Sequence, residues 1–152
     1  MIKLHDYQVD AVNHARERLA AGIQSLCLVS PTGSGKTVMA SFIIKSALQR
    51  HKRILFLAHR RELIKQCANK IQIAGVDDFG MILSGQQTDP EYDHPLQIAS
   101  VQTLVNRDLP PADLIIIDEA HHAVGGQYQS ILSQYPRAYR LGLTATPQRL
   151  DG

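Results

Sequence analysis

The segment Ser30 to Thr37, Ser-Pro-Thr-Gly-Ser-Gly-Lys-Thr, has the residue types and spacing of a loop that holds phosphate groups. Its glycines let the backbone approach a ligand closely, and N–H groups at a helix N-terminus attract anions. The lysine can reach the β- and γ-phosphates of a nucleoside triphosphate, and the next hydroxyl can bind Mg²⁺. We therefore predict ATP and Mg²⁺ as cofactors, held by Thr32, Gly33, Ser34, Gly35, Lys36 and Thr37.

The context of this loop supports the prediction, although the loop departs from the strict pattern G-x-x-x-x-G-K-[ST] because Ser30 stands in place of the first glycine. An apolar run over 23–30 predicts a buried strand before the loop, and apolar residues at helical spacing predict a helix over 35–50 after it. The alternative is a Ser/Gly/Thr turn that only joins the strand to the helix. Gly-Lys-Thr opening a helix after such a strand favours the phosphate site.

A second chemical element follows the apolar run Leu114 to Ile117, which leads directly into Asp118-Glu119-Ala120-His121. Ligands of parallel α/β sheets bind beyond the carboxyl ends of the strands, so these acids should face the same crevice as the phosphate loop. Asp118 would then hold Mg²⁺, and Glu119 would orient or deprotonate the attacking water. Taken alone, adjacent acids after a strand are also typical of a solvated helix start.

The elements that must position these residues alternate along the chain. We expect helices over 6–21, 35–50, from 61 to near 75, a short one at 102–103 and another over 128–135. Strands are expected over 23–30, 53–58, 79–83, 96–100, 114–117 and 139–143, and the polar segment 84–95 is expected to be a mobile loop. This alternation predicts an α/β fold, a doubly wound, mostly parallel sheet with helices on both faces.

Asp118 to His121 is the sequence of the DEAH box, and the chain resembles the N-terminal RecA-like motor domain of superfamily 2 helicases and translocases. The likeness is to the branch that includes restriction-enzyme subunits and repair helicases. Tyr7-Gln8 resembles the Q motif and Phe56 to Leu63 resembles motif Ia. Val101 to Leu104 resembles the nucleic-acid-contacting segment before the DEAH box, and Thr144 to Pro147 resembles motif III.

The resemblance implies a role for each matching residue. Tyr7 and Gln8 would contact adenine, although an exposed polar residue on a helix is the plainer interpretation of Gln8. The implied catalytic residues are Lys36, Asp118, Glu119 and His121, and the implied nucleic-acid contacts are His59, Arg60, Arg61, Gln102 and Thr103. Thr144 and Thr146 would couple the γ-phosphate to nucleic acid through His121. A solvated basic turn at 60–61 and a helix cap at Thr103 are the alternatives.

Two departures from the family pattern affect these expectations. His5 stands where an arginine is usual, which bears on the adenine contact. Helicases of this type also have a second RecA-like domain with motifs IV to VI and an arginine finger, and no segment of this chain resembles it. We therefore expect residues 1–152 to form one ATP-binding domain, working with that second domain in cis and with nucleic acid, DNA more than RNA. Alone, it should bind Mg-ATP and turn over little.

Composition is consistent with this interpretation without proving it. The 152 residues are 44% hydrophobic, enough for one core, and a net charge of +2 is too small to indicate a nucleic-acid binder. No apolar run is long enough to span a bilayer, and we expect a cytoplasmic protein. Cys27 is expected in a core strand and Cys67 on a helix face, both as reduced packing residues, because no Cys-x-x-Cys spacing occurs.

Two other function classes remain open from the sequence. One is a module that binds nucleotide and nucleic acid without productive catalysis, and the intact Glu119 argues against it. The other is an unrelated phosphate-loop enzyme such as a small-molecule kinase, which would have no affinity for polynucleotides.

Overall fold

The computed structural model describes residues 4–29, 35–59, 61–83, 93–118 and 126–144. In chain order the elements are α1 (Asp6–Ala20), β1 (Ser25–Val29), α2 (Gly35–Gln49), β2 (Ile54–Ala58), α3 (Arg61–Ile73), β3 (Gly80–Ile82), β4 (Leu96–Ser100), α4 (Val101–Leu104), β5 (Leu114–Ile117), α5 (Gly126–Leu132) and β6 (Tyr139–Thr144). Most bounds lie within one or two residues of the sequence predictions. The expected loop at 84–95 falls almost wholly outside the described residues.

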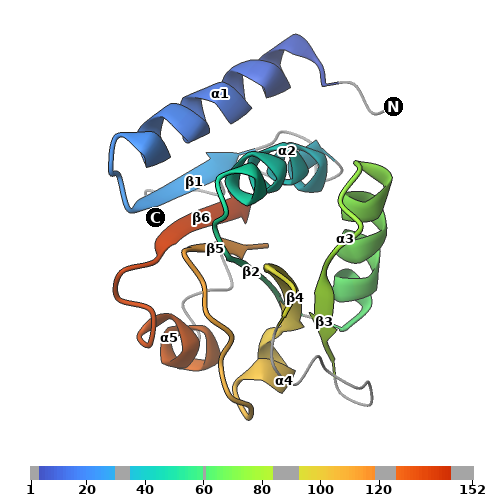
Figure 1. Ribbon diagram of the computed structural model, residues 1–152, viewed down its shortest axis with the longest axis vertical. Coiled ribbons are helices and arrows are strands. Elements are labelled where there is room, and N and C mark those ends of the chain that lie inside the picture. The colour runs from blue at the N-terminus through green and yellow to red at the C-terminus, as the bar shows by residue number, and fades with distance from the viewer. Residues whose placement is uncertain (1–3, 30–34, 60, 84–92, 119–125, 145–152) are drawn as a thin grey trace, which may run out of the picture.

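The strands form one six-stranded sheet in the order β1-β6-β5-β2-β4-β3, and every pairing is parallel. Figure 1 shows α1, α2 and α3 on one side of this sheet and α4 and α5 on the other. The predicted doubly wound fold is confirmed. Because all strands run the same way, their carboxyl ends lie along a single edge.

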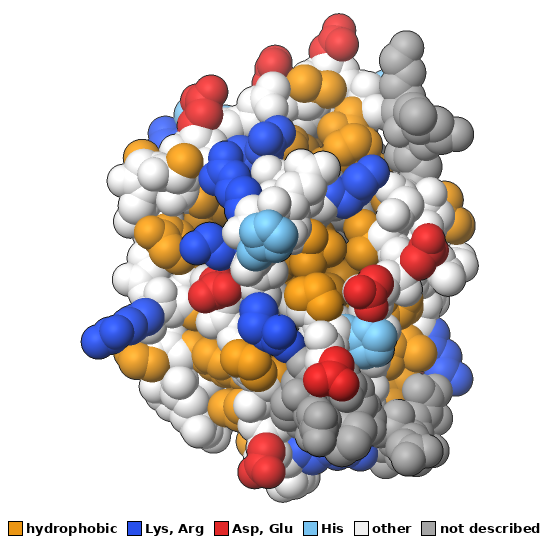
Figure 2. Space-filling view, viewed as in Figure 1, with side chains coloured by type: hydrophobic (Ala, Val, Ile, Leu, Met, Phe, Trp, Pro, Cys, Tyr) orange, Lys and Arg blue, Asp and Glu red, His pale blue; other side chains and the backbone are white. Residues whose placement is uncertain are grey.

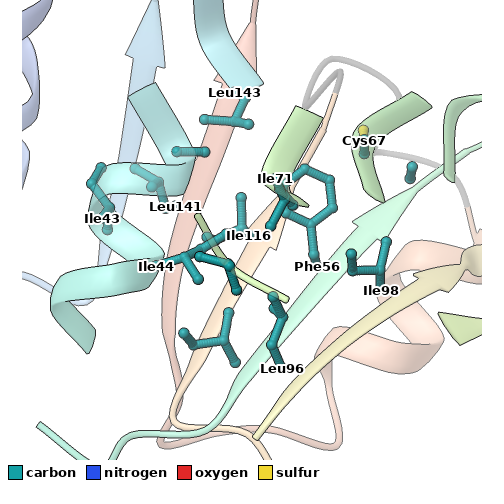
Figure 3. Close-up of a cluster of buried hydrophobic side chains, with 14 of the residues drawn as sticks. Ile43, Ile44, Phe56, Cys67, Ile71, Leu96, Ile98, Ile116, Leu141 and Leu143 are labelled. Carbon is teal, nitrogen blue, oxygen red and sulfur yellow. The ribbon is translucent and has the colours of Figure 1, made fainter. Parts of the chain in front are cut away.

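The central strands are buried on both faces, and alternate residues enter two separate cores. Phe56 and Ile116 belong to the core under α1, α2 and α3, whereas Leu57 and Ile117 belong to the core under α4 and α5. Figure 3 shows side chains of α2 and α3 meeting the sheet residues of the first core. Such continuous apolar strands are typical of parallel sheets covered by helices on both sides.

Strand β1 differs from the prediction of a buried strand. Leu28 is its one buried residue, Val29 is 39% exposed, and Cys27 is exposed, so the prediction of a core position for Cys27 is wrong. The physical reason is position, because β1 stands at one end of the strand order and only its α2-facing side packs into a core. Alternation of apolar residues cannot tell an end strand from a central one.

The fifth helix also differs from its prediction, since it begins at Gly126 and ends at Leu132 rather than covering 128–135. The predicted stops after α1 and α3 are confirmed, because Gly22 and Gly75 adopt φ angles of +90° and +104°. His51 adopts φ 61° after α2 without being glycine. In the described part of the chain, no helix has the length and apolarity to cross a bilayer.

Shortening Ile116 should measure how much the first core contributes to stability. Ile116 is fully buried on β5, so Ile116→Ala should lower the free energy of unfolding by about 2 to 5 kcal/mol in urea titrations. Ile73→Ala removes the same atoms from a side chain that is 61% exposed and should change it by less than about 0.5 kcal/mol. Equal losses in the two variants would contradict this description of the core.

Candidate nucleotide-binding site

The carboxyl edge of the sheet brings together segments that lie far apart in the sequence. Val29, the residue before the phosphate loop, pairs with Thr144 at the end of β6. On the other side of β6, Ile117 pairs with Gly142, so Asp118 follows directly beside the last residues of β6. The backbone N–H of Asp118 donates to the carbonyl of Leu57 on β2 at 2.9 Å, which fixes where β5 ends.

The N-terminus of α2 lies over this edge and buries its polar side chains. Lys36 is 5% exposed and Thr37 is 4% exposed. The Lys36 ammonium Nζ lies 3.3 Å from Asp118 Oδ1, and Asp118 is itself 3% exposed. Two of the predicted site residues, 82 positions apart, therefore form a buried ion pair. A buried charge is tolerated only when it is paired, so this contact joins α2 to β5.

Cys67 of α3 completes the surroundings of Asp118, a contact that the sequence did not predict. Its thiol Sγ donates to Asp118 Oδ2 at 3.6 Å, and Thr37 also hydrogen bonds with it. Burial raises the pKa of the Cys67 thiol from 9.0 to about 12, helped by the nearby Asp118 carboxylate. The thiol thus stays protonated between the two predicted Mg²⁺ ligands. The stripe Ile64, Cys67, Ala68 and Ile71 predicted its inward direction correctly, and all four are buried.

Thr37 and Asp118 suit the metal predicted for them by the chemistry of their donors. Mg²⁺ binds oxygen ligands and is usually held by one or two protein groups together with substrate phosphates. A hydroxyl and a carboxylate, both buried at one edge and both in contact with Cys67, meet that requirement. Among the described residues, no group of three or more His, Cys, Asp or Glu side chains could hold an ion unaided.

The candidate adenine contacts lie at the start of α1. Gln8 is 6% exposed, so its interpretation as an exposed polar residue is wrong. Its side-chain oxygen accepts from the backbone N–H of His5 at 2.9 Å, which helps to begin the helix. Tyr7 is 48% exposed, and its ring lies parallel to the His5 ring with centroids 6.0 Å apart. His5, the departure from the family pattern, therefore contacts the residue expected beside the base.

The candidate nucleic-acid contacts follow two neighbouring strands at the same edge. Ala58 pairs with Ser100, so His59 after β2 lies beside the start of α4. Gln102 is exposed and Thr103 is half-buried within that helix. Ser100 occupies the N-cap position, so the interpretation of Thr103 as the helix cap is wrong. Arg61 is the first residue of α3.

Several predicted residues lie outside the described part of the chain: Thr32, Gly33, Ser34, Arg60, Glu119, His121 and Thr146. Their roles stay predictions. Of the remaining set, Lys36, Thr37, Asp118 and Thr144 are all buried where β1, β6 and β5 end, and Gly35 begins α2 beside them.

Comparison with known proteins identifies the family to which the sequence is similar. Residues 1–149 match the model of the family described as type III restriction enzyme, res subunit. A type I restriction enzyme EcoAI endonuclease subunit of Escherichia coli is 35% identical over 160 residues, covering 93% of this chain and 19% of that protein. The DNA 3'-5' translocase XPB2 of Sulfurisphaera tokodaii is 34% identical over 156 residues, covering 99% of this chain and 32% of that protein.

The fold is also similar to that of solved helicase structures. The UvsW helicase from bacteriophage T4 superimposes with a TM-score of 0.77 at 22% identity, covering 97% of this chain and 54% of that chain. The chain spans only 19% and 32% of the two curated relatives.

Replacing Cys67 should change how stability depends on pH. In the unfolded chain the thiol ionises near its ordinary pKa of 9.0, whereas in the folded state it does so near 12. Above pH 9 the unfolded state binds fewer protons, so stability falls as the pH rises, by up to about 1.4 kcal/mol per pH unit. Between pH 8 and pH 10, the wild type should lose about 1.4 kcal/mol more than Cys67→Ser in urea titrations.

The matched control for this measurement is Cys27→Ser, at the exposed cysteine of β1. Between pH 8 and pH 10, Cys27→Ser should lose most of the free energy of unfolding that the wild type loses. An unchanged pH dependence in Cys67→Ser would show that the buried thiol does not titrate as described.

Proposed function

This chain belongs to the family of the type III restriction enzyme res subunit, within the superfamily 2 helicases, and we propose that it is the ATP-binding domain of a DEAH-type motor acting on DNA. The motor would couple ATP hydrolysis to movement along nucleic acid or to its remodelling. The observation that carries the proposal is the buried ion pair of Lys36 with Asp118 at the carboxyl edge of the sheet. It supplies a cation for phosphate and an anion for metal at one place.

We propose that the ion pair keeps Lys36 and Asp118 both charged until Mg-ATP binds. Out of water, Lys36 would attract the β- and γ-phosphates far more strongly than an exposed lysine could. Asp118 and Thr37 would hold Mg²⁺, which supplies neutralisation of the charge that develops during phosphoryl transfer. Before nucleotide binds, each charge satisfies the other, so neither is left buried alone.

Hydrolysis also needs an activated water, and we assign that role to Glu119, the residue after Asp118. His121 with Thr144 and Thr146 would report the γ-phosphate to the nucleic-acid side. The burial of Thr144 at the end of β6, the strand beside β5, supports this assignment. Tyr7 and Gln8 would contact the adenine.

The nucleic acid would lie along the ends of β2 and β4, against His59, Arg60, Arg61, Gln102 and Thr103. The proximity of His59 to the start of α4 supports a continuous contact surface. Phosphate contacts of this kind position a strand without reading its sequence. The name of the related DNA translocase, 34% identical, supports DNA as the substrate.

We propose that residues 1–152 form one domain and that efficient turnover requires a second RecA-like domain. An arginine finger is worth about 10³ to 10⁵ in rate, and no segment of this chain resembles the motifs that carry it. The 152-residue protein should therefore bind Mg-ATP and hydrolyse it slowly, and joining the second domain should restore DNA-stimulated turnover.

Removing the lysine tests the phosphate assignment. Lys36→Ala should weaken Mg-ATP binding at least about tenfold in equilibrium titrations, since it deletes a charge-assisted contact. The control is Lys45→Ala on the same helix, whose ammonium donates to the carbonyl of Ala74 at 3.2 Å and should leave binding unchanged. A thermal melt of each variant separates lost binding from lost fold. Normal ATP binding by folded Lys36→Ala would refute the phosphate assignment.

Replacing the proposed base tests catalysis separately from binding. In a protein that carries the second RecA-like domain as well, Glu119→Gln should keep Mg-ATP affinity and reduce hydrolysis by about 10² to 10⁴-fold, measured in single turnover with duplex DNA present. Unchanged hydrolysis would remove Glu119 from the mechanism. Equal hydrolysis by the wild type and Glu119→Gln at the background rate, with intact binding, would favour a binding module instead.

A further inference from the structure

A second concave site lies at the opposite end of the sheet from Asp118. It is a pocket of about 320 Å³ between the C-terminal ends of α1 and α2 and the amino ends of β5 and β6. Its floor is apolar, with Ile43, Leu114 and Ala138 all buried. Toward the left of Figure 2, hydrophobic side chains reach the surface with Lys and Arg side chains beside them. Ligand pockets begin at about this volume.

The rim of this pocket is strongly basic. Arg16, Arg50, Lys52 and Arg137 are all exposed and line it together with one acid, Asp113. Four cations and one anion give a formal +3, against +2 for the whole chain. The carboxyl ends of α1 and α2 each contribute roughly half a negative charge, which still leaves the pocket positive.

The rim cations are not neutralised by the protein itself. Within the described ranges, none of the four takes part in an ion pair. Asp113, the one acid of the lining, accepts from the backbone N–H of Arg53 at 2.8 Å, where it fixes the start of β2. The positive charge therefore faces solvent around an apolar hollow.

Two of these cations flank the turn that ends α2. After α2 the N–H of His51 donates to the carbonyl of Leu48 and that of Lys52 to the carbonyl of Ala47, both at 3.0 Å. This tight turn has φ 61° at His51, a conformation that glycine adopts most readily. Arg50 and Lys52 flank this turn, so its hydrogen bonds fix their backbone positions beside the pocket.

The pocket is separate from the nucleotide-binding site. Lys36 lies at the first turn of α2 and Arg50 just beyond its last, and a helix of 15 residues is roughly 22 Å long. Both sites can therefore be occupied at once.

We propose that this pocket is a docking site for an acidic peptide segment of a partner protein, which inserts one large apolar side chain between the four cations. A peptide with carboxylates around a leucine or phenylalanine matches both the charged rim and the apolar floor. A nucleic-acid backbone matches only the rim, because its phosphates and sugars gain little from an aliphatic hollow. The apolar floor of the pocket therefore favours a peptide over a nucleic acid as the ligand.

The proposal is tested with the 152-residue protein and two fluorescein-labelled eight-residue peptides of Asp and Glu, one with a central leucine and one with a central serine. Fluorescence anisotropy should show the leucine peptide binding roughly tenfold or more tighter, as expected for burial of its side chain. The rim variant Arg50→Glu with Arg137→Glu should weaken it at least tenfold. So should Ala47→Leu, which extends a side chain of the lining into the hollow.

The matched control reverses two exposed cations outside the pocket, Arg18→Glu with Lys65→Glu, and should leave peptide affinity within about twofold. An unchanged thermal melt shows that each variant is folded, and the peptide assay needs no nucleotide, so the test is independent of the proposed motor activity. Equal binding of the two peptides would overturn the proposal. So would a 20-nucleotide single strand that binds more tightly than the leucine peptide and is lost in the rim variant.

Discussion

The structure depends on one buried pair of opposite charges, Lys36 with Asp118. Each charge left alone in the interior would cost several kcal/mol, so the pair favours packing that brings the start of α2 to the end of β5. The strand order provides this meeting, since β6 alone separates β5 from β1, the strand that leads into α2. The pair follows strands whose central residues, such as Leu57 and Ile116, are fully buried.

The same constraint organises the neighbours of the pair. Lys36 occupies one oxygen of the Asp118 carboxylate, and the thiol of Cys67 donates to the other. Satisfying a buried carboxylate in this way requires α3 to lie close to the edge of the sheet, which the packing of Ile64 and Ile71 achieves. At the opposite edge, four exposed cations surround an apolar hollow instead.

The central elements were predictable because their local signals agree with the fold. The run Leu114–Ile117 is a strand with the predicted bounds, and the stripe of α3 faces inward as its spacing indicated. The exposure of Cys27 was not predictable, since it depends on β1 standing at the end of the strand order. The contact of Cys67 with Asp118 was not predictable either. The spacing of apolar residues along a helix shows which side faces the core, but not which residue of another element lies opposite.

The parallel topology also determines the order in which strands can pair while the chain is being synthesised. Ser25 at the start of β1 pairs with Arg140 on β6, 115 residues later. A ribosome that adds about 5 to 20 residues per second needs roughly 6 to 23 seconds to synthesise those 115 residues. During this interval β2, β4 and β3 can pair with one another, whereas β6, the strand that pairs with β1, has not yet been made. Strand β1 therefore gains its hydrogen-bonded neighbour only late in translation, and until then its backbone N–H and C=O groups stay unpaired in the sheet.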